Sequence, residues 1–194
     1  MPALSYVAIV LAGRGSERLG GADKAMVELD GTTLLDRALQ GAGGATEVVV
    51  VGPPRPTSSP VVWAEEQPAG GGPVAALAAG LASAQPTDAV LLLASDLPFI
   101  AEGVPSLVAA LTPGTDVAIL VDDDGRANYL AALWRRSSVE ARLTGLGDLA
   151  GLPMRRMLEG MAVAEVRDTD GWGFDCDTWE ALDLARQRGA TSTS

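Results

Sequence analysis

Short apolar runs alternate along this chain with segments whose apolar residues recur every three or four positions. The first pattern is typical of buried strands, and the second of helices that lay one face on a sheet. We predict strands at 7–11, 48–51, 61–63, 89–94, 117–121, 127–134 and 163–166. We predict helices at 34–39, 74–84, 105–111 and 139–143, a short helix from Pro153 and a last helix after Thr178.

Strands that alternate with helices form βαβ units, and such units build a mostly parallel sheet with helices on both faces. The pattern therefore predicts an α/β fold of three layers, α/β/α, with a Rossmann-like plan. Neither a repeat nor a linker interrupts the pattern. We expect a single domain over residues 1–190 and a flexible tail at 191–194.

The first strand runs directly into a loop that is rich in glycine and basic residues. Glycine lets the backbone come close to an anion, and successive N–H groups can converge on it. Arg14, Arg18 and Lys24 add positive charge within the same loop. Arginine binds phosphate as a planar fork and lysine as a mobile point charge. The loop is a candidate phosphate site, although a solvated strand-to-helix loop would have similar residues.

The basic loop contrasts with the acidic character of the whole chain. The formal net charge is −11, which opposes binding to nucleic acid or to an anionic membrane surface. An anionic ligand must then be held by a local positive site. The chain has no histidine, which excludes Ser-His-Asp and Cys-His mechanisms and metal sites built on histidine. Its chemistry must depend on carboxylates, cations, backbone dipoles and hard metal ions.

Cysteine content and hydropathy indicate the cellular compartment in which the protein works. The single cysteine, Cys176, allows no intrachain disulfide, as is usual in a reducing cytosol. We find neither the basic start of a signal peptide nor an apolar run approaching ~18 residues. We therefore expect a cytoplasmic protein without a membrane segment.

Two common phosphate-binding motifs do not fit the loop. A P-loop requires Lys-Ser or Lys-Thr after its last glycine, and a dinucleotide-binding loop requires glycine where this chain has Arg18. The loop reads LAGRGSERLGGADKA over residues 11–25 and resembles the signature LAGGxSxRMGxDKA of the molybdenum cofactor guanylyltransferases, the MobA family. Arg14 stands where the family has its second glycine. We expect its side chain to point outward and contact a phosphate; the alternative is that it obstructs the site.

Two later segments extend the resemblance, which is strong up to residue 105 and weak beyond it. Gly72-Pro73-Val74 is similar to the family's Gly-Pro-Leu near the nucleobase. By the same resemblance, Val51 and Glu65 would lie near the base. Gly125–Ala131 loosely matches the segment before the family's molybdopterin-facing strand.

The resemblance also implies a set of residues around the nucleotide. Those that would bind it are Leu11, Ala12, Gly13, Arg14, Gly15, Ser16, Lys24, Val51, Glu65, Gly72 and Asp96. Backbone N–H groups of the glycine loop would face the triphosphate. Arg18, Lys24 and Asp96 would act in catalysis, the first two by neutralising charge on the phosphates.

Asp96 follows the most apolar strand of the chain, and ligands of open α/β sheets bind at the carboxyl ends of strands. The family keeps Asp-x-Pro here as its magnesium ligand, so the resemblance makes Asp96, with Asp177 or Asp175, the ligands of Mg²⁺. The last two replace asparagines of the family. Structural interpretations stay open: Asp96 caps a turn before Pro98, or Asp177 or Thr178 caps the last helix.

The activity implied by the resemblance is transfer of GMP from GTP–Mg²⁺ to the phosphate of molybdopterin, with release of pyrophosphate. That acceptor is anionic near neutral pH and needs no histidine base. Arg155 and Arg156 are candidates to bind it. Residues 1–105 would form a nucleotide-binding half and residues 106–190 an acceptor-binding half. Partners would be GTP or another nucleoside triphosphate, molybdopterin, and proteins that make or accept the molybdenum cofactor.

Two other function classes remain open at this point. One is a different nucleotidyltransferase of the same fold, which uses CTP or acts on a sugar phosphate. The other is a non-catalytic accessory protein that binds nucleotides, which the exchange at Arg14 would allow.

Overall fold

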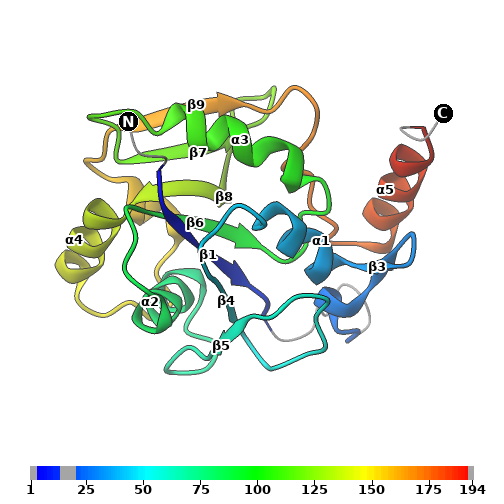
Figure 1. Cartoon of the computed structure of the whole chain (residues 1–194), viewed down its shortest axis with the longest axis horizontal. Coiled ribbons are helices and arrows are strands. Elements are labelled where there is room, and N and C mark those ends of the chain that lie inside the picture. Colours follow the sequence, from blue (N-terminus) through cyan, green and yellow to red (C-terminus); the bar gives the residue numbers. More distant parts are fainter. Residues whose placement is uncertain (1–3, 14–20, 192–194) are drawn as a thin grey trace.

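The computed structural model describes residues 4–13 and 21–191 and shows a seven-stranded sheet between two layers of helices (Figure 1). The strands are β1 (Tyr6–Leu11), β4 (Val48–Val51), β5 (Val62–Ala64), β6 (Ala89–Ala94), β7 (Val117–Val121), β8 (Ala127–Arg135) and β9 (Val163–Arg167). Their order across the sheet is β5-β4-β1-β6-β8-β7-β9. Among the described strands of this sheet, β8 alone runs antiparallel to its neighbours, so the predicted mostly parallel sheet is confirmed.

Helices cover both faces of the sheet, and the last helix packs beside the sheet on Leu29 and Leu34. The helices are α1 (Leu34–Gly41), α2 (Pro73–Ser83), α3 (Ile100–Ala110), α4 (Arg136–Leu146) and α5 (Trp179–Thr191), with the 3-10 helices η2 (Lys24–Met26) and η3 (Met154–Leu158). A small hairpin joins β2 (Glu28–Leu29) to β3 (Thr32–Thr33). One core lies between the sheet and α1 and α3, and the other between the sheet and α2, α4 and η3. None of the described helices combines the length and apolar character needed to cross a bilayer.

The alternation of side chains along β1 shows how one strand serves both cores. Ala8 and Val10 face the α1 and α3 side, whereas Val7 and Ile9 face the α2 side. All four side chains are fully buried. A strand buried on both faces must be apolar at every position, which is why continuous apolar runs predicted these strands. Each predicted strand is found to within one residue at either end.

The helix α3 begins earlier than predicted. The sequence placed this helix at 105–111, but it spans Ile100–Ala110 and contains Pro105 in its interior. Ile100, Val104 and Leu107 are buried on one face at helical spacing. Their burial outweighs the hydrogen bond that the exposed Pro105 cannot donate. The helix therefore passes through the proline.

The last helix reaches Thr191, the first residue of the predicted flexible tail. Residues 192–194 lie outside the described chain, so the flexibility of the tail stays a prediction. Arg188 holds the last turns of α5 by donating hydrogen bonds to the carbonyls of Asp170 and Gly171. Its guanidinium also lies 4.1 Å from the ring centroid of Phe99, a cation–π contact. These tertiary contacts thus hold the C-terminal part of α5 in place.

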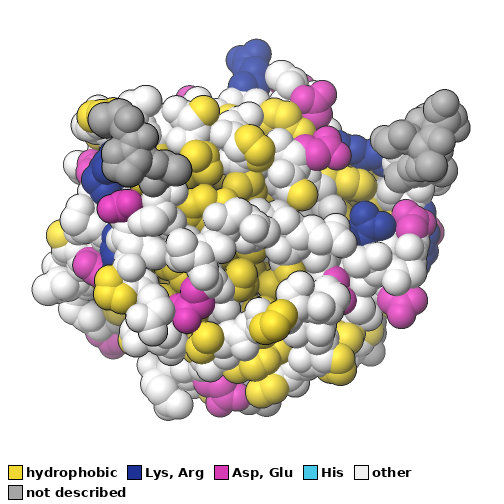
Figure 2. Space-filling view, viewed as in Figure 1, with side chains coloured by type: hydrophobic (Ala, Val, Ile, Leu, Met, Phe, Trp, Pro, Cys, Tyr) yellow, Lys and Arg dark blue, Asp and Glu magenta, His cyan; other side chains and the backbone are white. Residues whose placement is uncertain are grey.

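Charge is thinly spread over the face of the molecule seen in Figure 2. Acidic side chains lie scattered around its rim, and the basic ones drawn in colour lie singly among them. On this face the described residues form no broad basic surface, in keeping with the net charge of −11. A nucleic-acid backbone would need such a surface.

Candidate active site

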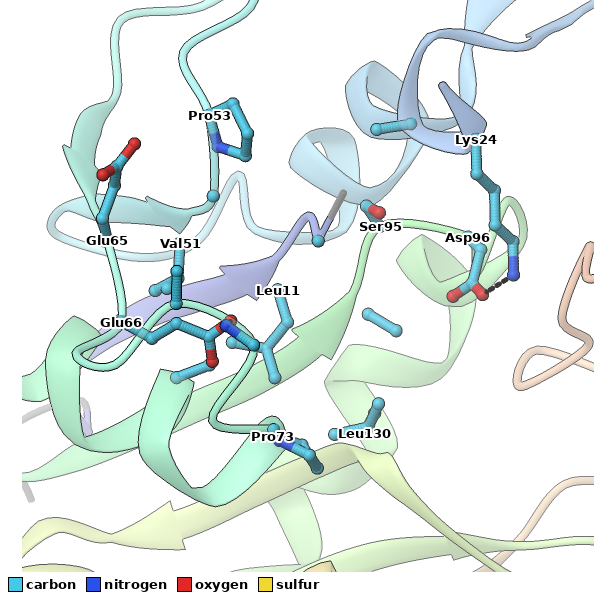
Figure 3. Close-up of a pocket in the computed structure, with 18 residues that line it drawn as sticks. Leu11, Lys24, Val51, Pro53, Glu65, Glu66, Pro73, Ser95, Asp96 and Leu130 are labelled. Atoms are coloured by element: carbon cyan, nitrogen blue, oxygen red, sulfur yellow. Dashed lines mark hydrogen bonds and ion pairs between the residues drawn. The ribbon is translucent and has the colours of Figure 1, made fainter. Parts of the chain in front are cut away.

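The carboxyl ends of β1, β4 and β6 open into a cavity of about 400 Å³ (Figure 3). These three strands are parallel neighbours, so their ends meet at one edge of the sheet, where open α/β sheets bind ligands. The predicted nucleotide-site residues that line this cavity are Leu11, Gly13, Lys24, Val51, Glu65, Gly72 and Asp96. The structure therefore brings together residues of the glycine loop and of four later segments of the sequence.

Other predicted residues lie behind the cavity or beyond the described chain. Ala12 is fully buried, and its N–H donates to the carbonyl of Val51 at 2.9 Å, which extends the pairing of β1 with β4. Arg14, Gly15, Ser16 and Arg18 lie outside the described residues. Their roles, including the outward direction of Arg14, stay predictions.

The cavity has a charged end and a more apolar body (Figure 3). Lys24 and Asp96 lie together at one side, and Glu65 lies at the opposite side. Leu11 and Val51 lie between them. Such a division suits a ligand with an anionic part and a flat, largely apolar part.

Asp96 is placed by a turn at the end of β6 and tied to the tail of the chain. Its carbonyl accepts a hydrogen bond from the Cys176 N–H at 3.1 Å. The Cys176 side chain is fully buried, and burial, with the charge of Asp96, raises the pKa of its thiol to about 12. Asp175 and Asp177 flank this anchored cysteine. The backbone contact thus brings both predicted tail aspartates to the end of β6.

Lys24 forms ion pairs with both Asp96 and Asp177. Burial alone would lower the pKa of Lys24, but the charge of Asp96 and hydrogen bonds to both carboxylates raise it above the ordinary value. The pKa of Asp175 is also raised, by burial and by the charges of Asp177 and Asp96. Among the described side chains, these three carboxylates thus face one ammonium group, which leaves the cluster rich in negative charge.

Asp96 does not act as a cap in the described structure. Its Oδ1 is buried and has no hydrogen-bond partner among the described residues, while Oδ2 faces Lys24. The helix cap at α5 is Thr178, whose Oγ1 accepts from the Ala181 N–H at 3.2 Å. Asp177, the other candidate cap, is directed to Lys24. A buried carboxylate oxygen without a partner is costly and marks a place where a ligand can bind.

These carboxylates suit a hard divalent cation. In the described chain no group of three or more cysteine, aspartate or glutamate side chains is arranged to hold a metal ion by itself. Mg²⁺ needs only one or two carboxylates, because it keeps several waters and takes further oxygens from phosphates. Asp96 and Asp177 already share one cation, the Lys24 ammonium. The residues present therefore fit a metal ion that is bound together with a phosphate ligand.

Comparison with known proteins decides the family. The family model of the MobA-like NTP transferase domain matches residues 8–166. A molybdenum cofactor guanylyltransferase of Rhodobacter capsulatus is 33% identical over 189 residues, which cover 93% of this chain and 94% of the relative. This chain belongs to the MobA-like NTP transferase family. The predicted family is confirmed, and the chain is a nucleotidyltransferase.

Solved structures support the MobA-like fold. The molybdopterin-guanine dinucleotide biosynthesis protein A of Archaeoglobus fulgidus superposes with a TM-score of 0.68 at 21% identity and covers 96% of this chain and 99% of its own. Rv0371c of Mycobacterium tuberculosis, solved in complex with manganese, superposes with a TM-score of 0.69 at 17% identity. That superposition covers 94% of this chain and 98% of the other. At 21% and 17% identity, these superpositions show the fold alone.

A second cavity of about 450 Å³ adjoins the first in this MobA-like domain. The two share Pro73 and Leu130 in their linings. The second is also lined by Arg126, Asn128 and Asp175, so it includes part of the 125–131 segment that resembles the family.

The arginine pair expected at an acceptor phosphate lies elsewhere. Arg155 and Arg156 are in the lining of neither cavity, and Arg156 is 2.9 Å from the carboxylate of Glu159. The pair lies in η3 on the α2 side of the sheet. The structure gives no support to the hypothesis that this pair binds the acceptor.

One residue beside the site was not predicted from the sequence. Arg55 lies on the loop between β4 and β5, and its guanidinium contacts Ala12, Gly13 and Asp23. No role was predicted for this loop from the sequence. A basic residue just beyond the carboxyl end of a buried strand, in an acidic chain, was the signal that could have identified it.

Proposed function

We propose that this MobA-like transferase moves GMP from GTP to the phosphate of molybdopterin and releases pyrophosphate. The observation that carries the proposal is the meeting of Lys24, Asp96 and Asp177 at the charged end of the cavity. The Rhodobacter capsulatus relative, named a molybdenum cofactor guanylyltransferase, supports the choice of substrates because its match covers nearly the whole chain. We assign this reaction to the cytoplasm, which the single cysteine of the chain supports.

The charged end of the cavity receives the triphosphate. Asp96 and Asp177 would hold a Mg²⁺ ion, which when bound offsets charge on the α-phosphate and on the departing pyrophosphate. Lys24 lies at the same end and supplies a positive charge to the phosphate oxygens. It is the only lysine in the chain, since every other basic residue is arginine. A compact ammonium on a flexible stem can exchange a carboxylate for a phosphate more readily than a planar fork can.

The apolar body of the cavity receives the base. Leu11 and Val51 provide apolar surface there. Guanine carries two adjacent N–H donors on one edge, and a carboxylate can accept both. We expect Glu65, which lines the cavity, to do so, since the carboxylate of the neighbouring Glu66 already accepts the Gly70 N–H at 2.9 Å.

The second cavity receives the acceptor. It meets the nucleotide cavity at Pro73 and Leu130, so an acceptor bound there directs its phosphate toward the charged end of the first. An oxygen of the acceptor phosphate attacks the α-phosphorus, the bond to the β-phosphate oxygen breaks, and pyrophosphate leaves with the electron pair. The protein contributes positioning and charge stabilisation, and no covalent intermediate is required.

A calorimetric screen of GTP, CTP, ATP and UTP, each with Mg²⁺, tests the assignment of the donor. We expect GTP to bind most tightly and Asp96→Asn to remove the dependence of GTP binding on Mg²⁺. Asp183→Asn is the matched control, because Asp183 is an exposed carboxylate on α5 paired with Arg186. Its binding should equal that of the wild type.

Two results of this screen would contradict the proposal. A preference for CTP would replace guanylyl transfer with cytidylyl transfer. Unchanged Mg²⁺ dependence in a folded Asp96→Asn variant would remove Asp96 from the metal site. Thermal unfolding of each variant identifies a loss that comes from misfolding.

A further inference from the structure

Arg55 joins the two ends of the glycine loop. Its side chain is only 6% exposed, although it begins on a surface loop between β4 and β5. Its Nη1 donates to the carbonyl of Ala12 at 2.8 Å, and its Nη2 donates to the carbonyl of Gly13 at 2.7 Å. Its Nε donates to the Asp23 carboxylate at 2.7 Å. One guanidinium thus contacts the residues on both sides of the segment 14–22.

These contacts use the geometry that distinguishes arginine from lysine. A fourth hydrogen bond runs from Nη1 to the carbonyl of Pro53 at 3.1 Å, so most of the five N–H donors are paired. The donors point in fixed directions from one rigid plane, and a lysine ammonium cannot reproduce that pattern. The Asp23 carboxylate balances the buried charge, as a buried guanidinium requires.

Asp23 pairs with Arg55 and does not cap the helix that follows it. It occupies the N-cap position of η2, where an aspartate usually accepts a backbone N–H of the helix. Its side chain makes no such cap bond. The carboxylate instead faces Arg55, so a long-range contact fixes the start of η2. The first residue of η2 is Lys24, and the position of its ammonium group therefore depends on the same contact.

The backbone around Arg55 is shaped for close approach to the glycine loop. A Cβ atom on Gly52 would lie 2.0 Å from the carbonyl oxygen of Ala12, and Gly52 has a φ of +147°. Only glycine fits such a contact without a shift of the backbone. The loop after β4 thus packs directly on the end of β1, which brings Arg55 within reach of the Gly13 carbonyl.

We infer that Arg55 is a positioning residue for the triphosphate site. It sets the distance and direction between Gly13 and Lys24, two residues of the glycine loop that line the cavity. Its donors are committed to protein oxygens, so it acts through these residues and does not touch the nucleotide. The inference rests on the proposed use of this cavity for a nucleoside triphosphate.

The test compares Arg55→Lys with the wild type, using the ratio of nucleoside to nucleoside-triphosphate dissociation constants. This ratio measures how much the phosphate groups contribute to binding affinity. We expect Arg55→Lys to reduce this ratio by roughly tenfold or more, because charge-assisted contacts to phosphate depend on geometry. Affinity for the bare nucleoside should change by less than about twofold, since the base end of the cavity is untouched.

Arg37→Lys is the matched control. Arg37 also donates two hydrogen bonds to a carbonyl, that of Leu29 at 3.2 and 2.7 Å, and its side chain is 19% exposed. It lies in α1 and is absent from the lining of both cavities. The same chemical change there should leave the ratio unchanged. Asp23→Ala, at the 43% exposed end of the Arg55 contact, should lower the ratio in the same direction and keeps the test open if Arg55→Lys does not fold.

A double variant separates positioning from a general loss of stability. Because Arg55 acts through Lys24, adding Arg55→Lys to Lys24→Ala should lower the ratio less than Arg55→Lys does alone. Equal losses in both backgrounds, or an unchanged ratio in folded Arg55→Lys and Asp23→Ala, would overturn the inference.

The ratio is measured with whichever nucleotide the wild type binds best, so failure of the two proposals can be told apart. A preference for CTP would remove the guanine assignment and still test Arg55. A wild type that binds no triphosphate more tightly than its nucleoside would refute the proposed function and, with it, the role of Arg55.

Discussion

Lys24 shows how a single residue can be placed for function at some cost to local stability. The described carboxylates around it outnumber its one positive charge, and Asp96 has a buried oxygen without a hydrogen-bond partner. A structural ion pair would be expected to satisfy both oxygens. The excess of negative charge is explained if further positive charge arrives with the ligand.

We predict that Lys24→Ala weakens binding of Mg²⁺–GTP by roughly tenfold or more and binding of guanosine far less, because the lost charge faces phosphate. Lys24→Arg should restore little of this affinity. Its guanidinium would bind the carboxylates of Asp96 and Asp177 as a bidentate fork and leave them less readily than an ammonium does. Calorimetry with GTP and guanosine measures both effects.

Equal losses for GTP and guanosine in Lys24→Ala would indicate a structural defect in place of a lost phosphate contact. Full affinity in Lys24→Arg would show that mobility of the charge is unimportant. Acylation of Lys24 offers a second readout, because it is the only lysine and bound Mg²⁺–GTP should protect it from modification.

At the scale of elements, the approach of α2 to the sheet is fixed by a glycine. A Cβ on Gly80 would lie 2.6 Å from Ile9 Cγ2 and 3.1 Å from Val51 Cγ2. Ile9 is β-branched and fully buried on β1, so it has no room to move aside. Val51 also lines the nucleotide cavity, and Pro73 at the start of α2 lines both cavities. Packing of α2 therefore affects the shape of the site.

We predict that Gly80→Ala lowers the free energy of unfolding by about 1–3 kcal/mol, because overpacking outweighs the gain in helix propensity. The control is Gly145→Ala on α4, where a Cβ would meet nothing within 4 Å. That change should raise the free energy of unfolding by up to about 1 kcal/mol. Urea unfolding measures both. A stabilised Gly80→Ala would show that α2 can move away from β1 without cost.

The sequence predicted elements well where one local pattern determined them, and it failed where distant contacts did. Continuous apolar runs identified the central strands β1, β6 and β7, because burial on both faces leaves no polar positions. The predicted start of α3 was wrong because proline is common at the beginning of a helix, which favoured a start at Pro105. The burial of Ile100 and Val104 stabilises the helical turn before the proline. The contacts of Arg188 with the carbonyls of Asp170 and Gly171 could not be predicted either, because they join α5 to a separate loop.

The residues of the candidate site also fall into those that a local pattern identifies and those that only distant contacts reveal. Lys24 lies within a contiguous motif, and Asp96 lies at the end of an apolar strand, so both could be identified from local sequence. The contact of Lys24 with Asp177 joins residues 153 positions apart, and no local pattern shows which tail aspartate faces the lysine. Arg55 was missed for the same reason, because its partners Gly13 and Asp23 belong to another segment.

At the scale of the whole molecule, one reversed strand explains how the second half of the chain reaches the site. Parallel strands end at the edge where the nucleotide cavity lies. β8 is antiparallel to β6, with Leu93 opposite Ala131, so β8 begins at that edge. Leu130 consequently lies beside the end of β6 and lines both cavities, and Arg126, just before β8, lines the second. The predicted nucleotide-binding and acceptor-binding halves thus meet along the β6–β8 pair.

Transfer of labelled GMP tests the central claim most directly. The purified protein is incubated with GTP labelled at the α-phosphate, Mg²⁺ and molybdopterin, and both the labelled product and pyrophosphate are measured. We predict a labelled molybdopterin guanine dinucleotide and an equal amount of pyrophosphate, with neither formed when molybdopterin or Mg²⁺ is omitted or when Asp96→Asn replaces the wild type. Pyrophosphate release that does not depend on molybdopterin, or no labelled dinucleotide at all from protein that binds GTP, would contradict it.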